Sequence, residues 1–382
     1  MFVRRKRFLS LPIYSYSKSI GFPMAVKLED IAKATGFSVP TVSRVITHSN
    51  YPVNAETRTK ILEAAQSMGY KPNLSARSLR TERSLTIGII VDDLLSPFTP
   101  SIVRGIQDYL NEHEYLGLIV NSDWNPDLEQ EAIQTLVSRP VDGIIFVEYS
   151  HLAVSDILEQ SNKPHVFVHR LFGTPIKNSI VPDDEYGASQ AVRHLFNLGH
   201  RRIAYINGPE SWHSSKKRLS GYQAELAANN LEIEPTLIQP GDWEFEGGYK
   251  AAQNLMGLKE PPTAIFSAND LMALGTIHAI QDMGLNVPNN IAVVGYDNRD
   301  FTKIVRPKIT TMSMPVYEMG WSAAELLLKQ IAEGREDLDE IKIKGQLFIR
   351  ETCGAEESQR TKEERVSTTE ARRIMLNKHP EV

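Results

Sequence analysis

Residues 28–46 read LEDIAKATGFSVPTVSRVI, and this stretch decides the fold of the first part of the chain. Residues 28–34 carry apolar side chains at helical spacing, and Gly36 stands where such a helix ends in a left-handed residue. Ser38 can then cap a second helix, with Pro40 in the first turn, where its missing N–H costs nothing. Two short helices around a glycine turn predict a helix-turn-helix, although an ordinary helical hairpin has the same pattern.

The second helix has a buried side and an outward side. Val42, Val45 and Ile46 form the apolar stripe that it would bury. The residues at its start that are left facing outward are Val39, Pro40, Thr41, Ser43 and Arg44. A third helix is expected over residues 54–69, capped by Asn54 and ended by Gly69, and it would complete a helical module over residues 26–72.

Charge is distributed unevenly along the chain. The 382 residues carry 42 Lys and Arg against 47 Asp and Glu, which gives a net charge of −5. Residues 1–84 carry 14 Lys and Arg against 5 Asp and Glu, so this segment is +9 and the remainder is −14. A basic first module on an acidic body predicts an anionic partner for the first module.

The ends of the chain and the single cysteine bear on localisation. Residues 1–25 begin with a basic cluster but lack the clean apolar core of a signal peptide, so a disordered basic extension is expected, or translation that starts at Met24. One cysteine, Cys353, allows no disulfide within the chain, which suits a reducing compartment. No apolar run approaches the ~20 residues of a membrane span. A cytoplasmic protein is therefore expected.

From residue 85 the pattern changes to alternating strands and helices. Strands are expected within 86–91, 115–122, 142–147, 165–170, 201–208, 263–270 and 291–298. The chain then returns through 310–316 to its last helix and ends the folded body with 345–354. Helices are expected over 100–114, 127–138, 152–161, 184–198, 217–230, 271–283 and 316–332. Continuous apolar strands alternating with helices predict an α/β fold with doubly wound parallel sheets. Because the alternation of strands and helices starts again after residue 183, two lobes of similar architecture are expected.

These patterns predict a domain organisation. The lobes together span residues 85–354, and a basic linker over 73–84, which could form a short hinge helix, precedes them. The first lobe is expected to hold about 85–182 plus 315–342, and the second about 183–314 plus 343–354. The tail over 355–382 is polar and has no sustained heptad, so a coiled coil is not expected there.

The sequence favours ligand binding over catalysis. It contains no GxxxxGKS loop, GxSxG elbow, HExxH motif or CxxC pair, and its ten histidines show no metal-ligand spacing. No enzyme activity, cofactor or metal is therefore expected. Polar and aromatic residues gather instead where strands end, which is where open α/β sheets bind ligands. Rings that stack on C–H faces, beside carboxylate and guanidinium groups, suit a polyhydroxylated ligand, although core packing would also account for any one of these aromatics.

These motifs together resemble the LacI/GalR family of bacterial transcription repressors. The resemblance is carried by residues 28–46, then ETRTKILEAAQSMGYKPN and SARSLRTERSLTIGIIV, and it continues through VDGIIF, LGHRRIAYI, RLSGY, PPTAIFSANDLMALG, VVGYDN and ITTMSMPVYEMG. It covers residues 26 to about 354 in the expected order. It implies a helix-turn-helix head, a hinge helix, and a two-lobed body like a periplasmic sugar-binding protein. It also implies a homodimer on a palindromic operator.

The resemblance implies site residues, carried over by position. The DNA-binding residues are Ser38, Val39, Pro40, Thr41, Ser43, Arg44, Arg77 and Leu79, of which Leu79 matches a leucine that wedges into the minor groove. The effector-binding residues are Phe98, Arg218, Trp243, Asn269 and Asp297, to which Asp92 and Arg170 are added from their positions at strand ends. His169 and Thr99 depart from the family pattern, which puts the usual ligands in doubt but not the pocket.

The predicted function is therefore a sequence-specific DNA-binding transcription regulator. It is expected to be a repressor whose operator binding is controlled by a small sugar-like effector in the cleft between the lobes. One alternative is a solute-binding protein of a transporter, which would need a cleavable signal in place of residues 28–80. Another is a regulator that responds to a nucleobase or to a co-repressor.

Overall fold

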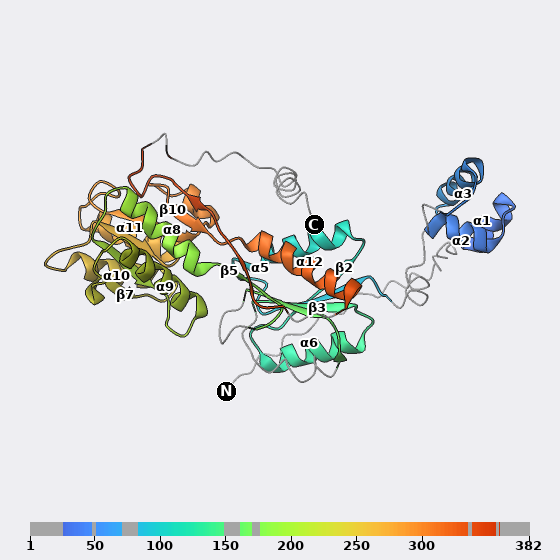
Figure 1. The fold of residues 1–382 in the computed structure, drawn as a ribbon, viewed down its shortest axis with the longest axis horizontal. Coiled ribbons are helices and arrows are strands. Elements are labelled where there is room, and N and C mark those ends of the chain that lie inside the picture. Colours follow the sequence, from blue (N-terminus) through green and yellow to red (C-terminus); the bar gives the residue numbers. More distant parts are fainter. Residues whose placement is uncertain are drawn as a thin grey trace, which may run out of the picture. The chain divides into compact units, whose positions relative to one another are not determined.

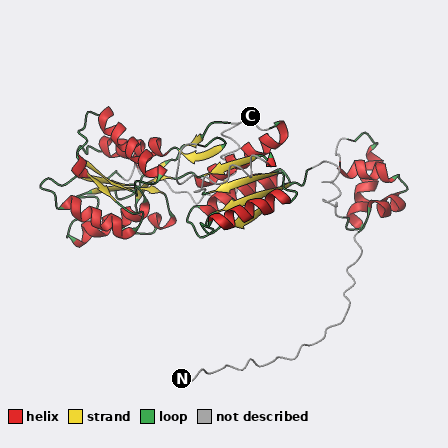
Figure 2. Cartoon of the chain, turned by 90° about the horizontal axis from the view of Figure 1, so that it is seen from below, coloured by secondary structure: helices red, strands yellow, loops and turns green. Residues whose placement is uncertain are grey.

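The computed structural model describes residues 26–47, 51–70, 83–148, 161–169, 176–334 and 338–356, together with Gln359. The chain divides into two compact units, Met1–Thr81 and Glu82–Val382, and each is described by itself. The described part of the first unit is helical and that of the second is α/β, which confirms the predicted fold class (Figures 1 and 2). The expected N-terminal extension, most of the linker and tail, and nearly all of the helix expected over 152–161 lie outside the described residues.

The first unit contains the three expected helices. They are α1 (Leu28–Thr35), α2 (Val39–Thr47) and α3 (Ala55–Ser67). Gly36 ends α1 with a left-handed φ of 77°. The Ser38 hydroxyl accepts a hydrogen bond of 3.3 Å from the Thr41 N–H at the start of α2. The Asn54 side chain accepts one of 2.7 Å from the Thr57 N–H at the start of α3, as caps of this kind do.

A small apolar core holds these helices together. Ile31 of α1, Val42 of α2 and Ile61 of α3 are each fully buried in it. Helices of this length are marginal in water alone, so their stability comes from this shared core. The short α2 can therefore keep polar residues on its outer side.

The second unit has two lobes, each defined by one six-stranded sheet. The first lobe has the strand order β11-β5-β4-β3-β1-β2, and all its pairings are parallel. Its strands are β1 (Thr86–Val91), β2 (Leu116–Asn121), β3 (Gly143–Val147), β4 (His165–Val168), β5 (Ser179–Pro182) and β11 (Ile341–Ile343). Helices α5 (Thr99–Glu112) and α12 (Val316–Glu333) cover one face of this sheet, and α6 (Pro126–Ser138) covers the other (Figure 1).

The second lobe has the strand order β12-β10-β9-β8-β6-β7. Its strands are β6 (Ile203–Asn207), β7 (Ile238–Pro240), β8 (Ala264–Ser267), β9 (Ala292–Asp297), β10 (Thr310–Ser313) and β12 (Leu347–Phe348). Its helices are α8 (Asp184–Asn197), α9 (His213–Ala228), α10 (Phe245–Met256) and α11 (Asp270–Asp282), with 3-10 turns at Pro235–Leu237 and Asp300–Lys303. The pairings are parallel except that β12 runs antiparallel to β10.

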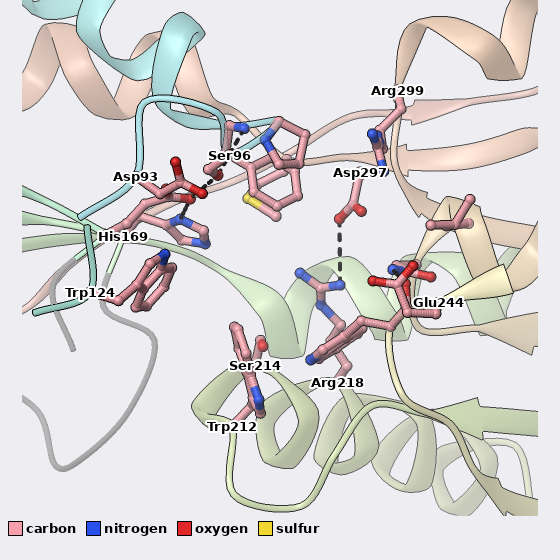
Figure 3. A pocket seen from close by; sticks show the side chains of 17 residues that line it. Asp93, Ser96, Trp124, His169, Trp212, Ser214, Arg218, Glu244, Asp297 and Arg299 are labelled. Carbon is pink, nitrogen blue, oxygen red and sulfur yellow. Dashed lines mark hydrogen bonds and ion pairs between the residues drawn. The ribbon is translucent and has the colours of Figure 1, made fainter. Parts of the chain in front are cut away.

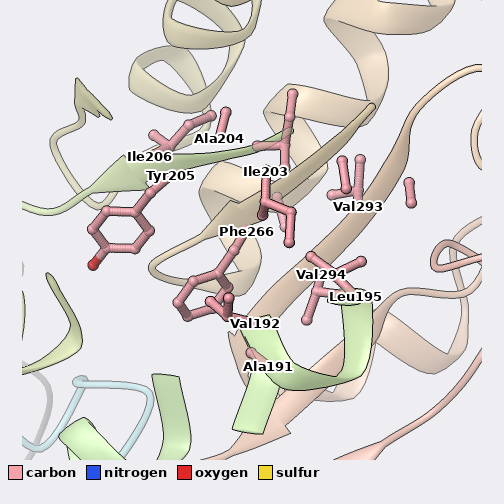
Figure 4. Close-up of a cluster of buried hydrophobic side chains, with 14 of the residues drawn as sticks. Ala191, Val192, Leu195, Ile203, Ala204, Tyr205, Ile206, Phe266, Val293 and Val294 are labelled. Atoms are coloured by element: carbon pink, nitrogen blue, oxygen red, sulfur yellow. The ribbon is translucent and has the colours of Figure 1, made fainter. Parts of the chain in front are cut away.

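The core of the second lobe explains its continuous apolar strands. Residues of β6, β8 and β9 meet residues of α8 in one buried cluster (Figure 4). Tyr205, Phe266 and Val294 are fully buried there. Because helices cover both faces of a parallel sheet, the central strands need apolar residues at every position.

The chain passes between the lobes three times, after β5, after β10 and after β11. Strand β11 ends at Ile343, one residue beyond the expected boundary at 342. Helix α9 begins at His213 rather than at 217. Strands β5, β7 and β11, each of three or four residues, were not predicted. Helix α10 was not predicted either, because it has the pair Gly247-Gly248 in its first turn, a composition that disfavours helices.

Candidate functional site

A cavity of about 450 Å³ lies between the two lobes of the second unit (Figure 3). It is lined by Asp93, Ser96, Pro97, Phe98, Trp124, Glu148 and His169 from the first lobe, and by Trp212, Ser214, Arg218, Trp243, Glu244, Asn269, Leu271, Asp297, Arg299 and Met314 from the second lobe and the crossing after β10. Its volume lies within the range of small-molecule sites, about 300–1,000 Å³. Its lining mixes aromatic rings with convergent polar groups.

The wall from the first lobe is organised around Glu148, which follows β3. The Ser96 hydroxyl donates a hydrogen bond of 2.7 Å to Glu148 Oε1, and the Thr99 hydroxyl donates one of 2.5 Å to Oε2. His169, which follows β4, places Nδ1 at 3.3 Å from Oε1. Burial alone would raise the pKa of Glu148, but hydrogen bonds from His169, Thr99 and Ser96 hold it below its usual value. This carboxylate is therefore ionised and fixed in place.

Phe98 and His169 complete that wall. Their rings lie edge to face, with centroids 5.5 Å apart. Because the Glu148 carboxylate stands beside Nδ1, the other ring nitrogen of His169 is the one that faces the cavity (Figure 3). Phe98 offers an apolar surface next to this polar atom.

The wall from the second lobe is organised around Arg218 of α9. Its Nε donates a hydrogen bond of 2.8 Å to Asp184, and its Nη1 lies 3.6 Å from Asp297 Oδ1 (Figure 3). Its guanidinium group also stacks over the Tyr296 ring at 3.7 Å. Burial opposes the charge on Arg218, but Asp184, Tyr296 and Asp297 outweigh it and raise its pKa above the usual value. Burial raises the pKa of Asp297 in turn, although Arg218 opposes that shift.

Trp243 and Asn269 are held by each other and by the helices behind them. The Asn269 side chain donates a hydrogen bond of 2.8 Å to the Trp243 carbonyl and accepts one of 2.8 Å from the Met272 N–H, so it also caps α11. The Trp243 ring lies 5.6 Å from the Arg218 guanidinium and 5.9 Å from the Trp212 ring. A side chain at Gly208 would overlap the Trp243 ring, so only glycine fits beneath it.

Backbone strain gathers around the cavity. Five of its lining residues have a left-handed φ, namely Trp124, Glu148, His169, Trp243 and Asp297. Such values are uncommon for any residue other than glycine, and they concentrate where the fold must aim side chains at a ligand. These residues follow or end strands, so the turn out of each strand is what directs them into the cavity.

Most of the predicted effector residues line this cavity. Phe98, Arg218, Trp243, Asn269 and Asp297 all line it. Asp92 does not: it is buried and accepts a hydrogen bond of 2.9 Å from the Ser122 hydroxyl. Its neighbour Asp93 lines the cavity instead. Arg170 lies outside the described residues.

Several lining residues were not among the predicted site residues. They are Asp93, Ser96, Pro97, Trp124, Glu148, His169, Trp212, Ser214, Glu244, Leu271, Arg299 and Met314. Asp93, Ser96, Pro97, His169 and Trp212 could have been chosen, because they too stand next to predicted strands. Trp124 carried no such signal, because it lies in the turn between β2 and α6.

The helical unit presents its own candidate surface on α2. Ser38, Pro40 and Arg44 are exposed, and Thr41 and Ser43 are half-buried. Val39 is also half-buried and packs against the core of the helical unit, so its side chain is less exposed than predicted. Arg44 donates a hydrogen bond of 3.1 Å to the Tyr51 hydroxyl. Arg77 and Leu79 lie outside the described residues.

Within the residues that the structure describes, no group of three or more His, Cys, Asp or Glu side chains is arranged to hold a metal ion. No helix in the same part of the chain is long and apolar enough to cross a membrane.

A helix-turn-helix module joined to a two-lobed α/β body with a cavity between its lobes defines a ligand-responsive DNA-binding regulator. The chain belongs to the lacI family of bacterial regulatory proteins. The family model described as "Bacterial regulatory proteins, lacI family" matches residues 27–73, and the model of a periplasmic binding protein-like domain matches residues 192–353.

Individual relatives are similar to this chain over most of its length. Catabolite control protein A of Priestia megaterium is 34% identical over 334 residues, which is 86% of this chain and 99% of the relative. The HTH-type transcriptional repressor CytR of Escherichia coli K12 is 34% identical over 80% of this chain and 90% of its own length. The lac repressor dimer bound to operator and the anti-inducer ONPF matches with a TM-score of 0.70 and 30% identity, over 87% of this chain and 100% of that one. A CelR–cellobiose complex matches with a TM-score of 0.63 and 28% identity, over 86% of this chain and 99% of that one.

Proposed function

We propose that this protein is a transcription repressor that binds a palindromic operator as a homodimer and is controlled by a small polyhydroxylated effector. The residues proposed to contact the operator are Ser38, Val39, Pro40, Thr41, Ser43 and Arg44, followed by Arg77 and Leu79 from the linker over 73–84. No catalytic residue and no cofactor belong to the proposal. A cytoplasmic location follows from the role, because the operator is there.

The proposal of a polyhydroxylated effector rests on the pairing of Arg218 and Asp297 beside Trp243. The guanidinium and carboxyl groups lie 3.6 Å apart at their nearest atoms, close enough to bridge adjacent hydroxyls of one ligand. The Trp243 ring, 5.6 Å from the guanidinium, offers a face on which C–H groups can stack. The relatives support the same reading, since one solved structure with this fold is a complex with cellobiose.

The proposed operator binding is tested with an operator duplex that the full-length protein selects from a random pool. A fragment that begins at residue 83 should lose operator binding, because the basic segment supplies the phosphate contacts. Arg44→Ala should lower operator affinity and reduce the slope of log affinity against log salt by about one. Arg104→Ala, which removes a basic side chain that is 57% exposed on the body, is the matched control and should change neither. Operator binding by the fragment would contradict the proposal.

A further inference from the structure

The lining of the cavity is rich in tryptophan. The chain contains four tryptophans, and three of them, Trp124, Trp212 and Trp243, line this cavity. Trp243 lies beside Arg218 and Asp297, the groups proposed above to hold one ring. The Trp212 ring lies 5.9 Å from that of Trp243. Trp124 comes from the other lobe.

Within the described part of the chain, no core cluster and no stacked ring accounts for the position of Trp124. It is 40% exposed and belongs to none of the buried clusters formed by the described residues. Its ring stacks on no other ring within the described part of the chain, whereas Trp321 packs against Tyr109 and Tyr317. A large apolar ring at the edge of a cavity, which the described residues neither stack on nor include in a core cluster, is suited to pack against a ligand.

The backbone at Trp124 is strained. Asp123 and Trp124 have φ values of 51° and 58°, two left-handed residues in succession, neither of them glycine. The turn is tied to the loop after β1 by two hydrogen bonds, from the Trp124 N–H to the Asp92 carbonyl at 3.1 Å and from the Leu94 N–H to the Asn121 side chain at 3.0 Å. Strain of this kind persists only where the surrounding structure imposes it, and it is common at ligand sites.

Figure 3 shows where this ring points. Trp124 and His169 approach the cavity from the first lobe, and Trp212 and Ser214 approach it from α9 and the loop before it. Asp297 and Arg299 lie at the other side of the same view. The lining therefore has two portions: an inner one around Arg218 and Asp297, which are buried, and an outer one that includes Trp124 and Trp212, which are more exposed.

The charges of the lining favour a neutral ligand. The described residues that line the cavity include four with carboxyl groups, Asp93, Glu148, Glu244 and Asp297. Two others, Arg218 and Arg299, have guanidinium groups. Arg218 is already paired with Asp184 and Asp297. A phosphorylated sugar would bring a negative charge into a site that has no unpaired excess of positive charge to receive it.

We propose that Trp124 and Trp212 form an outer stacking subsite, and that the effector is an uncharged saccharide of at least two rings. One ring lies against Trp243, with its hydroxyls on Arg218 and Asp297, and the next lies between Trp124 and Trp212. This inference rests on the proposed function and specifies the ligand class of the same cavity.

The test compares saccharides of one and two rings on the full-length protein. Cellobiose, maltose and lactose are titrated beside glucose, galactose and glucose 6-phosphate, and tryptophan fluorescence is followed in a Trp321→Phe background, in which only the cavity tryptophans emit. At least one disaccharide should bind more tightly than every monosaccharide, and glucose 6-phosphate should not bind. Trp124→Ala should weaken disaccharide binding about tenfold or more, the size typical of losing an aromatic anchor, and leave monosaccharide binding unchanged.

Controls separate the subsite from its alternatives. Trp124→Phe should restore most of the disaccharide affinity, and Leu95→Ala, which truncates a side chain that is 92% exposed and does not line the cavity, should have no effect. Equal affinity for one and two rings, or equal loss of both in Trp124→Ala, would overturn the subsite alone. A change of assembly state in Trp124→Ala by light scattering, with sugar binding intact, would assign the ring to a contact between copies. Binding of none of these sugars would contradict the proposed sugar effector, and the subsite with it.

Discussion

Glu129 is a carboxyl group buried on a surface helix. It lies on α6, is only 4% exposed, and its Oε1 atom has no hydrogen-bond partner among the described residues. Burial, and then the nearby charge of Asp92, raise its pKa from 4.5 to about 7. An acid whose pKa is higher in the folded state favours folding only while it is protonated, so its contribution is lost as pH rises from about 4.5 to 7.

Glu129→Gln should therefore stabilise the protein in a pH-dependent manner. At pH 8 we expect the free energy of unfolding to rise by about 1–2 kcal/mol, after allowance for solvent screening. The gain should shrink as pH falls and disappear near pH 4.5. Urea unfolding at several pH values measures it, and Glu131→Gln, an exposed site on the same helix, is the control. A gain that does not vary with pH would show that the charge of Glu129 is not the cause.

At this scale, sequence predicted part of the cavity. Phe98, Arg218 and Asp297, to which family position and strand ends both pointed, all line the cavity. Asp92 and Asp93 could not be separated, since the choice depends on which carboxylate turns back toward Ser122 after the last residue of β1. Trp124 was missed because its placement depends on a left-handed turn, which composition alone does not reveal.

At the scale of elements, helices cross closely at glycines. Gly105 of α5 and Gly320 of α12 face each other's helices: a Cβ on Gly105 would overlap the Tyr317 carbonyl, and one on Gly320 the Ile102 carbonyl. Neither obstacle is the flexible end of a side chain, so the backbones themselves would have to separate. This crossing fixes α12, the helix through which the chain returns to the first lobe.

Gly320→Ala should destabilise the protein because it forces these two helices apart. We expect a loss of about 1–3 kcal/mol, the usual cost of overpacking a tight contact. Gly257→Ala is the matched control, since a Cβ there would meet neighbouring carbonyls only at 3.4 and 3.5 Å, which is ordinary contact. Thermal or urea denaturation of both variants decides the matter. If both variants had the same stability, the close approach of α5 and α12 would not limit folding.

Most long, periodic elements were predictable, whereas the short strands β5, β7 and β11 and the helix α10 were not. The helices around Gly36 were predicted to within a residue or two, because caps, a glycine turn and an apolar stripe all agree there. Helix α10 was missed because Gly247 and Gly248 argue against a helix locally. A Cβ on Gly248 would overlap the backbone of Met272 in α11, so packing between the two helices explains a residue that local propensity disfavours.

At the scale of the whole molecule, charge and ligand chemistry are divided along the chain. The segment over 1–84 is +9 and the rest is −14, so attraction to DNA belongs to the first part and the cavity to the second. A regulator with this division must couple its two parts. That coupling is reciprocal, because a ligand that changes operator affinity by some factor has its own affinity changed by the same factor.

The most direct test of the account measures operator affinity by fluorescence anisotropy, without sugar and with the disaccharide that binds the cavity most tightly at saturation. We expect operator affinity to fall, by a factor within the range of about 5 to 150 that is usual for coupled sites. We also expect operator to lower sugar affinity by that same factor. An operator affinity that is unchanged at saturating sugar would contradict control of the operator by a sugar.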